Sequence, residues 1–391
     1  MIIRILCFTG YYLPAYKAGG PVKTIKNMVE HLPKMKFSIV TRDRDLHDLN
    51  SFDNVKVDEW QKTQNADVIY LSHAKKSIFK VAKIVDKHRF DVLYLNSFFD
   101  FDFSIKPLLA IKLGFSEPCP IVLAPRGEFS KGALVLKSLK KKVFIKIVSW
   151  FGLYKDVIWQ ASSEYEKQDI IDALSVHSDS VFVAKDLPAK LDGSSIVANY
   201  EPSEELRVVF LSRISPMKNL DFSLGTLAFV KSKVVFDIYG PKEDKEYWDR
   251  CSSLIKLLPA NISVNYCGTV MPEQVGDIFS SYDLFFFPTH GENYGHVIAE
   301  ALSVGTPVLI SDQTPWRNLE QDDLGWDYRL NSQDLFVARI ESLARMSPSK
   351  RLSYRKVVIQ NGMRRVNCDD DITKNKALFE FAVKKFNEKQ G

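Results

Sequence analysis

Two series of short apolar runs, separated by a polar stretch, constrain the fold of this chain more than any other feature. In the first series, β-branched or aromatic-rich runs alternate with amphipathic stretches such as residues 21–32 and 78–88. We expect the runs to form strands and the stretches between them to form helices. Such alternation predicts a mostly parallel sheet covered on both faces. The strands expected here are residues 2–8, 37–40, 68–71, 92–95, 121–124, 157–159 and 181–183.

A polar, turn-rich stretch around residues 193–205 interrupts the alternation, and a second series follows it. A chain of 391 residues is long enough for two domains, each with its own core. We therefore predict an α/β fold of two Rossmann-like, doubly wound domains, residues 1–195 and 206–374, facing a cleft at the carboxyl ends of their strands. The strands expected in the second series are residues 207–211, 234–239, 262–267, 284–287 and 308–310.

The amino-acid composition limits the classes of protein to which this chain can belong. The apolar fraction of 46% and the charged fraction of 26% are those of an ordinary globular protein, and the net charge of +5 is mild. We expect no nucleic-acid partner, because no basic patch with interleaved aromatic residues occurs. The five cysteines lack metal-ligand or disulfide spacing. No apolar run reaches the length of a membrane span, and residues 2–8 are too short for a signal peptide, so we expect a cytoplasmic protein.

The segment 288–307, PTHGENYGHVIAEALSVGTP, carries the strongest chemical signal. It follows a strand, and we expect a helix that begins near Gly295 and stops at Gly305. Glu292 precedes this helix and Glu300 lies inside it, so the unit offers anion-binding amides beside two carboxylates that can accept hydrogen bonds from hydroxyls. A nucleotide sugar needs both, whereas an ordinary strand–loop–helix with surface glutamates is the alternative. The candidate backbone donors are Tyr294, Gly295 and His296.

The spacing Glu292-x7-Glu300 resembles the signature of retaining GT-B glycosyltransferases of family four, the glycosyl transferases group 1. Arg213 and Lys218, in FLSRISPMKNLD, resemble the paired basic residues of that family. Three further segments resemble its glycine loop and its bacterial surface-polysaccharide branch, and the matches keep the family's order over residues 1 to 330. These segments are YLPAYKAGG (12–20), APRG (124–127) and ASSEYE (161–166).

The resemblance implies a metal-independent, retaining hexosyltransferase without a cofactor. Residues 1–195 would bind the acceptor, residues 206–374 would bind the nucleotide-sugar donor, and the helix 375–391 would cross back onto the first domain. The donor would be a UDP-sugar, with GDP and ADP left open. The acceptor would be a glycan or lipid-linked oligosaccharide in bacterial capsule, exopolysaccharide or O-antigen biosynthesis. The DxD-like pairs Asp43/Asp45 and Asp100/Asp102 are interpreted as surface or turn carboxylates.

The resemblance also implies roles for single residues. Arg126 stands near the place where many members have a histidine, and it cannot act as a base at neutral pH. From spacing alone, Arg213 and Lys218 could equally be cations of a solvated loop. The predicted catalytic residues are Glu292, Arg213, Lys218 and Arg126. The predicted donor-binding residues are Gly19, Gly20, Gly240, Val270, Tyr294, Gly295, His296 and Glu300, and those on the acceptor side are Asn96 and Glu128. Residues 314–320 are expected to help shape the donor pocket.

The stretch 134–150, LVLKSLKKKVFIKIVSW, combines lysines with apolar residues at helical spacing. We expect one apolar stripe to pack on the core. The lysines are either a solvated face or a contact with anionic lipid on the cytoplasmic side of the inner membrane, which would suit a polyprenyl-linked acceptor. The stripe is Leu136, Leu139, Val143, Ile147 and Trp150, and the lysines are Lys137, Lys140, Lys141, Lys142 and Lys146.

Three other functions compete with this prediction. The first is a glycosyltransferase that acts on a small soluble metabolite. The second is a nucleotide-binding module that has lost catalysis, which the joint presence of the basic pair and the glutamate pair argues against. The third is a nicotinamide oxidoreductase, which would need a dinucleotide fingerprint that the glycine loop 12–20 does not contain.

Overall fold

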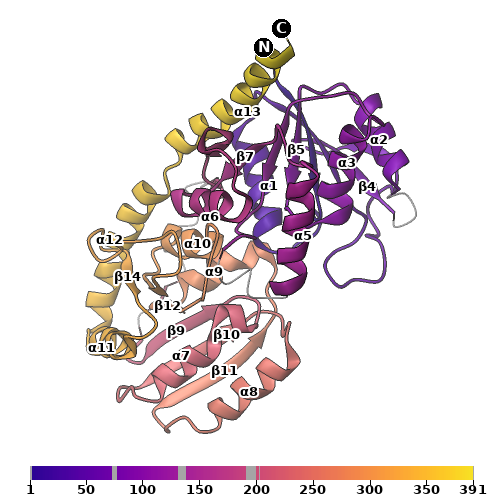
Figure 1. Cartoon of the computed structure of the whole chain (residues 1–391). Coiled ribbons are helices and arrows are strands. Elements are labelled where there is room, and N and C mark those ends of the chain that lie inside the picture. The colour runs from indigo at the N-terminus through magenta and orange to yellow at the C-terminus, as the bar shows by residue number, and fades with distance from the viewer. Residues whose placement is uncertain (1, 73–76, 131–137, 191–199, 202, 391) are drawn as a thin grey trace. The chain divides into compact units, whose positions relative to one another are not determined.

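The computed structural model describes residues 2–72, 77–130, 138–190, 200–201 and 203–390. The chain divides into two compact units. Unit 1 comprises Met1–Lys190 and Cys368–Gly391, and unit 2 comprises Leu191–Asn367. Figure 1 shows a sheet with flanking helices in each unit.

Unit 1 is built on an eight-stranded sheet with the order β3-β4-β2-β1-β5-β6-β7-β8. All neighbouring strands pair in parallel except the edge strand β3, which runs antiparallel to β4. The seven strands predicted for this half are confirmed within a few residues. The sequence did not predict β3, which is short and half-exposed and therefore carries no apolar run. The strands are β1 Arg4–Thr9, β2 Lys36–Arg42, β3 Trp60–Lys62, β4 Asp67–Leu71, β5 Val92–Asn96, β6 Ile121–Ala124, β7 Ile158–Ala161 and β8 Val181–Val183.

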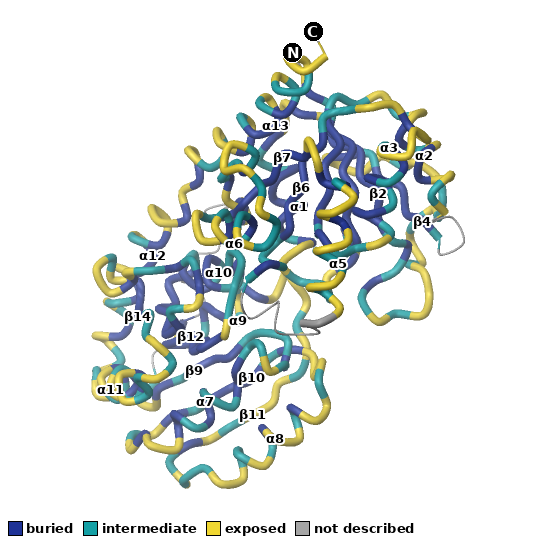
Figure 2. Tube along the Cα trace, viewed as in Figure 1, coloured by how far each residue is buried: buried dark blue, intermediate teal, exposed yellow. Residues whose placement is uncertain are grey.

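Helices cover both faces of this sheet, because alternate strand residues point to opposite sides and both sets are apolar. One face packs against α2, α3, α5 and α6, and the other against α1 and α13. Figure 2 shows the strands between them as buried. The helices are α1 Gly20–His31, α2 Ile78–Lys87, α3 Lys106–Lys112, α5 Ser138–Trp150, α6 Glu164–Leu174 and α13 Asp369–Gln390, with a π-helical turn at Phe101–Ile105 and a 3₁₀ turn at Ser178–Ser180.

The terminal helix α13 belongs to unit 1 although it follows unit 2 in sequence. It begins at Asp369, earlier than the expected residue 375. The ring of Phe379 on α13 lies edge-on to those of Phe37 on β2 and Tyr94 on β5, with centroids 6.4 and 5.2 Å apart. These aromatic contacts fix the helix on the sheet.

Helix α5 is rotated relative to the prediction. The predicted inward stripe points outward: 48% of Val143, 48% of Ile147 and 84% of Trp150 is exposed. Phe144 and Val148 pack on the core in their place. The helix has two apolar stripes, and the ring of Phe144 completes an aromatic cluster with Phe98 and Phe99. The prediction that the Val143 stripe packs on the core was therefore wrong; Leu136 of this stripe and Lys137 among the lysines lie outside the described residues.

Unit 2 contains a six-stranded, fully parallel sheet with the order β11-β10-β9-β12-β13-β14 around one apolar core. The five predicted strands are confirmed, and β14 was not predicted. Its strands are β9 Leu206–Leu211, β10 Val234–Tyr239, β11 Ile262–Gly268, β12 Leu284–Phe287, β13 Val308–Ser311 and β14 Gly325–Tyr328. Its helices are α7 Leu220–Leu227, α8 Lys245–Ile255, α9 Val275–Ser280, α10 His296–Ser303, α11 Gln333–Ala344 and α12 Pro348–Val366, with 3₁₀ turns at Pro216–Lys218 and Pro272–Gln274.

Helix α10 starts and stops where its sequence predicts. Gly305 adopts a φ of +81°, and its N–H donates to the carbonyl of Leu302 while Thr306 N–H donates to Ala301. This pair of bonds is the Schellman arrangement that ends many helices. A Cβ at position 305 would lie 2.5 Å from the side chain of Ile359 on α12, so the site admits only glycine.

Candidate functional site

Two predicted catalytic residues of unit 2 meet at the carboxyl edge of its sheet. The ammonium of Lys218 forms an ion pair with the carboxylate of Glu292. Only 13% of the Lys218 side chain and 15% of the Glu292 side chain are exposed. The ammonium also lies 5.6 Å from the ring centroid of Phe287, the last residue of β12. The pair is therefore held close to the end of the strand but still within reach of a ligand.

Backbone contacts between two loops bring this pair together. The N–H of His290 donates to the carbonyl of Met217 at 2.9 Å, and the side-chain amide of Asn219 donates to the carbonyl of Pro288 at 2.8 Å. Asn219 adopts a left-handed conformation with a φ of +60°, which asparagine tolerates better than most residues. The loop after β9 is thus fastened to the loop after β12, and Lys218 lies opposite Glu292.

The second predicted cation, Arg213, is also paired. Its Nη1 lies 2.7 Å from Oε1 of Glu243, which follows β10. Backbone bonds continue beyond the two strands: the N–H of Ile214 donates to Pro241 and that of Asp244 donates to Ile214. This short ladder fixes the register that places the arginine beside the glutamate. About a third of each side chain is exposed, so the Arg213–Glu243 pair is more accessible to solvent than the Lys218–Glu292 pair.

The entry to α10 is built around Gly295, which has a φ of +81° and caps the helix. The indole N–H of Trp316 donates to the carbonyl of Tyr294 at 2.6 Å, and the Tyr294 ring lies 4.7 Å from that of His296. A Cβ at Gly295 would contact Trp316 and the side chain of Ile298. Trp316, from the segment 314–320, therefore positions the helix N-terminus, whose first amides point along the axis and favour an anion.

The remaining predicted donor residues of unit 2 occupy the same edge or the same helix, whereas Gly19 and Gly20 lie in unit 1. Gly240 follows β10 with a φ of +134°, and a Cβ there would lie 1.8 Å from the carbonyl oxygen of Ser212. Packing of the two loops alone therefore demands glycine at this position. Val270 is half-buried just after β11, and Glu300 is half-buried one turn into α10. Arg213, Lys218, Gly240, Val270 and Glu292 thus all follow strands at the carboxyl edge of the unit 2 sheet.

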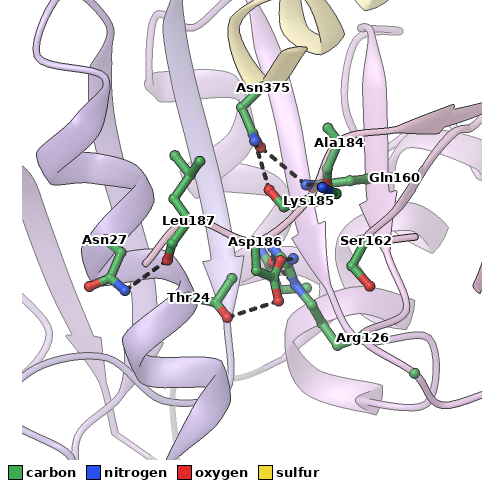
Figure 3. A network of polar contacts seen from close by, with 12 residues as sticks. Thr24, Asn27, Arg126, Gln160, Ser162, Ala184, Lys185, Asp186, Leu187 and Asn375 are labelled. Carbon is green, nitrogen blue, oxygen red and sulfur yellow. Dashed lines mark hydrogen bonds and ion pairs between the residues drawn. The ribbon is translucent and has the colours of Figure 1, made fainter. Parts of the chain in front are cut away.

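In unit 1, Arg126 and Asn96 join a buried polar network at the carboxyl edge of the sheet, and Figure 3 shows Arg126 within it. Arg126 follows β6 with a φ of +58°, and its guanidinium forms an ion pair with Asp186. The same guanidinium donates to Oδ1 of Asn96 at 2.8 Å and to the hydroxyl of Tyr94. Burial is the largest influence and opposes the charged form, but Asp186, Tyr94 and Glu166 together outweigh it, so the pKa of Arg126 is raised. Arg126 is therefore a charged side chain whose polar groups bind protein.

The segment after β8 is tied into this network from several elements. On the α1 side, Thr24 donates to Asp186 at 3.1 Å and Asn27 donates to the carbonyl of Leu187 at 2.8 Å. From α13, the side-chain amide of Asn375 donates to the carbonyl of Lys185 at 2.8 Å. Figure 3 shows these residues converging on the segment 184–187. The network thus fixes the chain that leaves unit 1.

Glu128 and Glu166 accept backbone N–H groups in unit 1. Glu128 accepts from Ser97 Oγ at 2.7 Å and from the N–H of Phe98 at 2.5 Å. Glu166, on α6, accepts from the N–H of Ser162 at 2.7 Å and from that of Gly127 at 2.5 Å. Burial raises the pKa of both carboxyl groups, and the hydrogen bonds oppose that effect. The carboxylates hold the loops that begin at the ends of β5, β6 and β7.

The glycine loop of unit 1 leads into α1. Gly19 is the N-cap of α1 with a φ of +67°, and a Cβ at Gly19 or Gly20 would meet no atom within 4 Å. Asp45 holds the loop by accepting from the N–H groups of Tyr16 and Lys17 at 2.8 and 3.0 Å. Asp43 and Asp45 are buried, so of the two interpretations, surface or turn carboxylates, the surface one was wrong. The open space beside the glycines adjoins the helix N-terminus.

Sequence reasoning missed two acidic partners, Glu243 and Asp186. Glu243 could have been predicted as a partner of Arg213. It follows β10, Arg213 follows β9, and these neighbouring parallel strands end at the same edge of the sheet. Asp186 could not have been predicted in this way, since its partner Arg126 lies 60 residues away. Among the described residues, no group of three or more His, Cys, Asp or Glu side chains is arranged to hold a metal ion.

Comparison with known proteins places these features in context. Residues 195–365 match the family model described as glycosyl transferases group 1. The chain is 26% identical over 240 residues to an uncharacterized 41.2 kDa protein in the cps region of Klebsiella pneumoniae, covering 59% of this chain and 63% of that protein. It is 28% identical over 132 residues to a D-inositol 3-phosphate glycosyltransferase of Rhodococcus erythropolis, covering 32% of this chain and 30% of that protein. The chain thus spans less than two thirds of either relative.

A solved structure extends the likeness to nearly the whole chain. The structure of Alr3699/HepE from Anabaena, determined in complex with UDP and glucose, superposes with a TM-score of 0.66. The match covers 97% of this chain and 99% of that one, at 14% sequence identity. At that identity, the likeness concerns the fold.

Proposed function

We propose that the protein is a glycosyltransferase that uses a nucleotide-diphosphate sugar. The match of residues 195–365 to the glycosyl transferases group 1 and the GT-B fold of the chain support this proposal. The observation that carries the proposal is the pairing of Lys218 with Glu292 at the carboxyl edge of the unit 2 sheet. Ligands of parallel α/β sheets bind at that edge. The pair offers a cation for a diphosphate and a carboxylate for sugar hydroxyls.

The proposed donor site uses each side chain for one part of the ligand. Lys218 and Arg213 neutralise the charge that develops on the leaving diphosphate, which is the largest demand of the reaction. The amides at the start of α10 (Tyr294, Gly295 and His296) add fixed partial positive charge. Glu300 accepts from the ribose hydroxyls, and the backbone at Gly240 and Val270 holds the base.

The two ion pairs imply an exchange of partners when the donor binds. The diphosphate replaces Glu292 as the partner of Lys218, and the released carboxylate then accepts hydrogen bonds from the transferred sugar or faces its developing positive charge. Because Arg213 and Lys218 supply the positive charge, we propose that no metal is required. We further propose retention of configuration, with the leaving phosphate taking the acceptor proton.

Unit 1 is proposed to bind the acceptor. Gly19 and Gly20 keep their predicted donor-binding role, and the open space beside them at the start of α1 would receive a phosphate group. Arg126, Asn96 and Glu128 would shape the acceptor side, acting as positioning residues through the loops that they fix. Arg126 is expected to keep its geometry when a ligand arrives, because it is held by Asn96 and Tyr94 as well as by Asp186.

The proposed acceptor is a growing glycan or a lipid-linked oligosaccharide of a bacterial surface polysaccharide. The relative from a Klebsiella cps region supports that setting. The Rhodococcus relative, a D-inositol 3-phosphate glycosyltransferase, supports a second candidate, a small soluble acceptor such as an inositol phosphate. The two are distinguished by offering both acceptor types with the same labelled donor.

Thermal unfolding with UDP, GDP, ADP and NAD tests the donor assignment. A ligand present at 100 times its Kd stabilises the folded state by about 2.7 kcal/mol, and we expect a shift with UDP. Lys218→Met should abolish that shift, whereas Lys245→Met, an exposed lysine on α8, should keep it. A shift with GDP or ADP alone would mean that the donor carries guanine or adenine in place of uracil. A shift with NAD alone would contradict the proposal.

A further inference from the structure

The outward face of α5 in unit 1 carries large apolar side chains that the fold leaves uncovered. Val143, Ile147 and Trp150 follow one another at helical spacing and are 48%, 48% and 84% exposed. Phe151 directly after the helix is 73% exposed, and its ring centroid lies 4.9 Å from that of Trp150. The two rings form one apolar projection at the end of the helix.

Lysines flank this apolar stripe on the same outward face. At 100° per residue, Lys146 falls beside Trp150, and Lys140 and Lys142 fall on either side of Val143. All three lysines are exposed, whereas Lys141 lies over the ring of Phe99 at 5.1 Å. Residues 129–155 contain seven lysines and no aspartate or glutamate. The face is therefore both apolar and strongly positive.

Neither property is explained by the proposed chemistry or by packing within unit 1. The core side of the helix is already filled by Phe144 and Val148. Contiguous exposed apolar surface marks an interaction site, and aromatic rings beside lysines suit the boundary between lipid headgroups and acyl chains. Among the described residues no helix is long and apolar enough to cross a bilayer. A second copy of the chain is a poor partner, because a symmetric contact would set lysines against lysines.

We propose that this face docks unit 1 on an anionic lipid bilayer. Trp150, Phe151, Ile147 and Val143 enter the headgroup region, and Lys140, Lys142 and Lys146 pair with lipid phosphates. The inference deepens the proposed function by naming the surface on which a lipid-linked acceptor would be met. It depends only on the exposed apolar and lysine side chains of residues 140–151, so its test needs neither donor nor acceptor.

Co-sedimentation of the full chain with vesicles tests the inference. We expect binding to phosphatidylcholine mixed with phosphatidylglycerol and little binding to phosphatidylcholine alone. Replacing all three lysines with glutamate should weaken binding by at least about 100-fold, since each lysine near an anionic surface contributes about fivefold. The matched control is the same change at Lys231, Lys245 and Lys256, exposed lysines of unit 2, which should leave binding unchanged.

The apolar part is tested separately with Trp150→Ser/Phe151→Ser, which should weaken binding at least about tenfold and make the remainder sensitive to salt. Phe229→Ser, an aromatic residue of unit 2 that is 65% exposed, is the control. Equal binding to neutral and anionic vesicles, or unchanged binding of either α5 variant, would overturn the inference. So would a dimer in sedimentation that Trp150→Ser/Phe151→Ser dissolves, because the occupant would then be a second copy. The UDP-induced melting shift should survive in every variant, so loss of lipid binding is distinguishable from failure of the proposed function.

Discussion

The carboxyl edges of the two sheets use charge in different ways. In unit 1, Arg126 and Asp186 form an ion pair that also binds Asn96, Tyr94 and Thr24. In unit 2, Lys218 and Glu292 form an ion pair, and the ammonium of Lys218 also lies over the ring of Phe287. Both pairs are mostly buried, so burial does not separate them.

The number of hydrogen-bonding partners separates them instead. A buried pair with several partners is costly to break, because each removed group leaves others unsatisfied. A pair with few partners can exchange one of them for a ligand at little cost. We infer that unit 1 uses its charges to hold loops in place and that unit 2 keeps its charges available for binding.

The largest expected effect is on catalysis. Lys218→Met should lower kcat/KM for the proposed sugar transfer by about 100- to 1,000-fold, the usual effect of removing a group that stabilises developing charge. Urea unfolding should show nearly unchanged stability, because the pair in unit 2 contributes little to the fold. A comparable loss of stability and activity would show that unit 2 depends on its ion pair as unit 1 does.

The second-largest expected effect is on the free energy of unfolding, and it compares the Arg126–Asp186 ion pair with the Lys218–Glu292 ion pair. Asp186→Asn leaves Arg126 buried and charged, and should lower the free energy of unfolding by about 3 kcal/mol. Glu292→Gln should cost under about 1 kcal/mol, since the amide oxygen can still accept from Lys218 and, among the described residues, no further hydrogen bond of the pair is broken. Hydrogen exchange resolves the two sheets, and faster exchange in the unit 1 strands alone is expected for Asp186→Asn. Equal costs would remove the distinction between the edges.

A smaller effect is expected at Glu243. Glu243→Gln removes the competitor of the diphosphate for Arg213, so the Kd for UDP should fall by about three- to fivefold in calorimetry, in line with a half-exposed ion pair. Glu246→Gln, on the nearby helix α8, serves as the control. Weaker UDP binding by Glu243→Gln would mean that Glu243 orients Arg213 toward the ligand and does not compete with it.

The smallest effect is a pH dependence of unit 1. Burial lowers the pKa of His31, which contacts the carbonyl of Pro188 at 3.0 Å, and that of His88. As the pH falls, the two imidazoles are therefore protonated first in the unfolded chain, near their ordinary pKa of 6.5. The stability that the protein has above that pH is lost as the pH falls toward the lower pKa values of the folded state. His31→Gln/His88→Gln should flatten urea-derived stability between pH 7.5 and pH 5.5, whereas exposed His177→Gln should not. If the dependence of stability on pH did not change in this variant, other groups would be responsible for the loss of stability at low pH.

The strand pattern and the main motif could be read from the sequence because both are local. The expected strands of both units are confirmed, and α10 opens at His296 and closes before Gly305 as its glycines predict. Short strands with little apolar content, such as β3, gave no such signal. Glu292, Lys218 and Arg213 could be assigned to one edge, because loops after parallel strands converge there.

The partners of the charged residues and the orientation of α5 were decided by tertiary structure. Whether Arg213 faces Glu243 depends on the register of two neighbouring loops, and whether Arg126 faces Asp186 depends on the return of a segment 60 residues away. Helix α5 has two apolar stripes of similar hydrophobicity, so its periodicity does not say which one is buried. The aromatic cluster around Phe98 selected Phe144, and this long-range packing left Trp150 exposed to solvent.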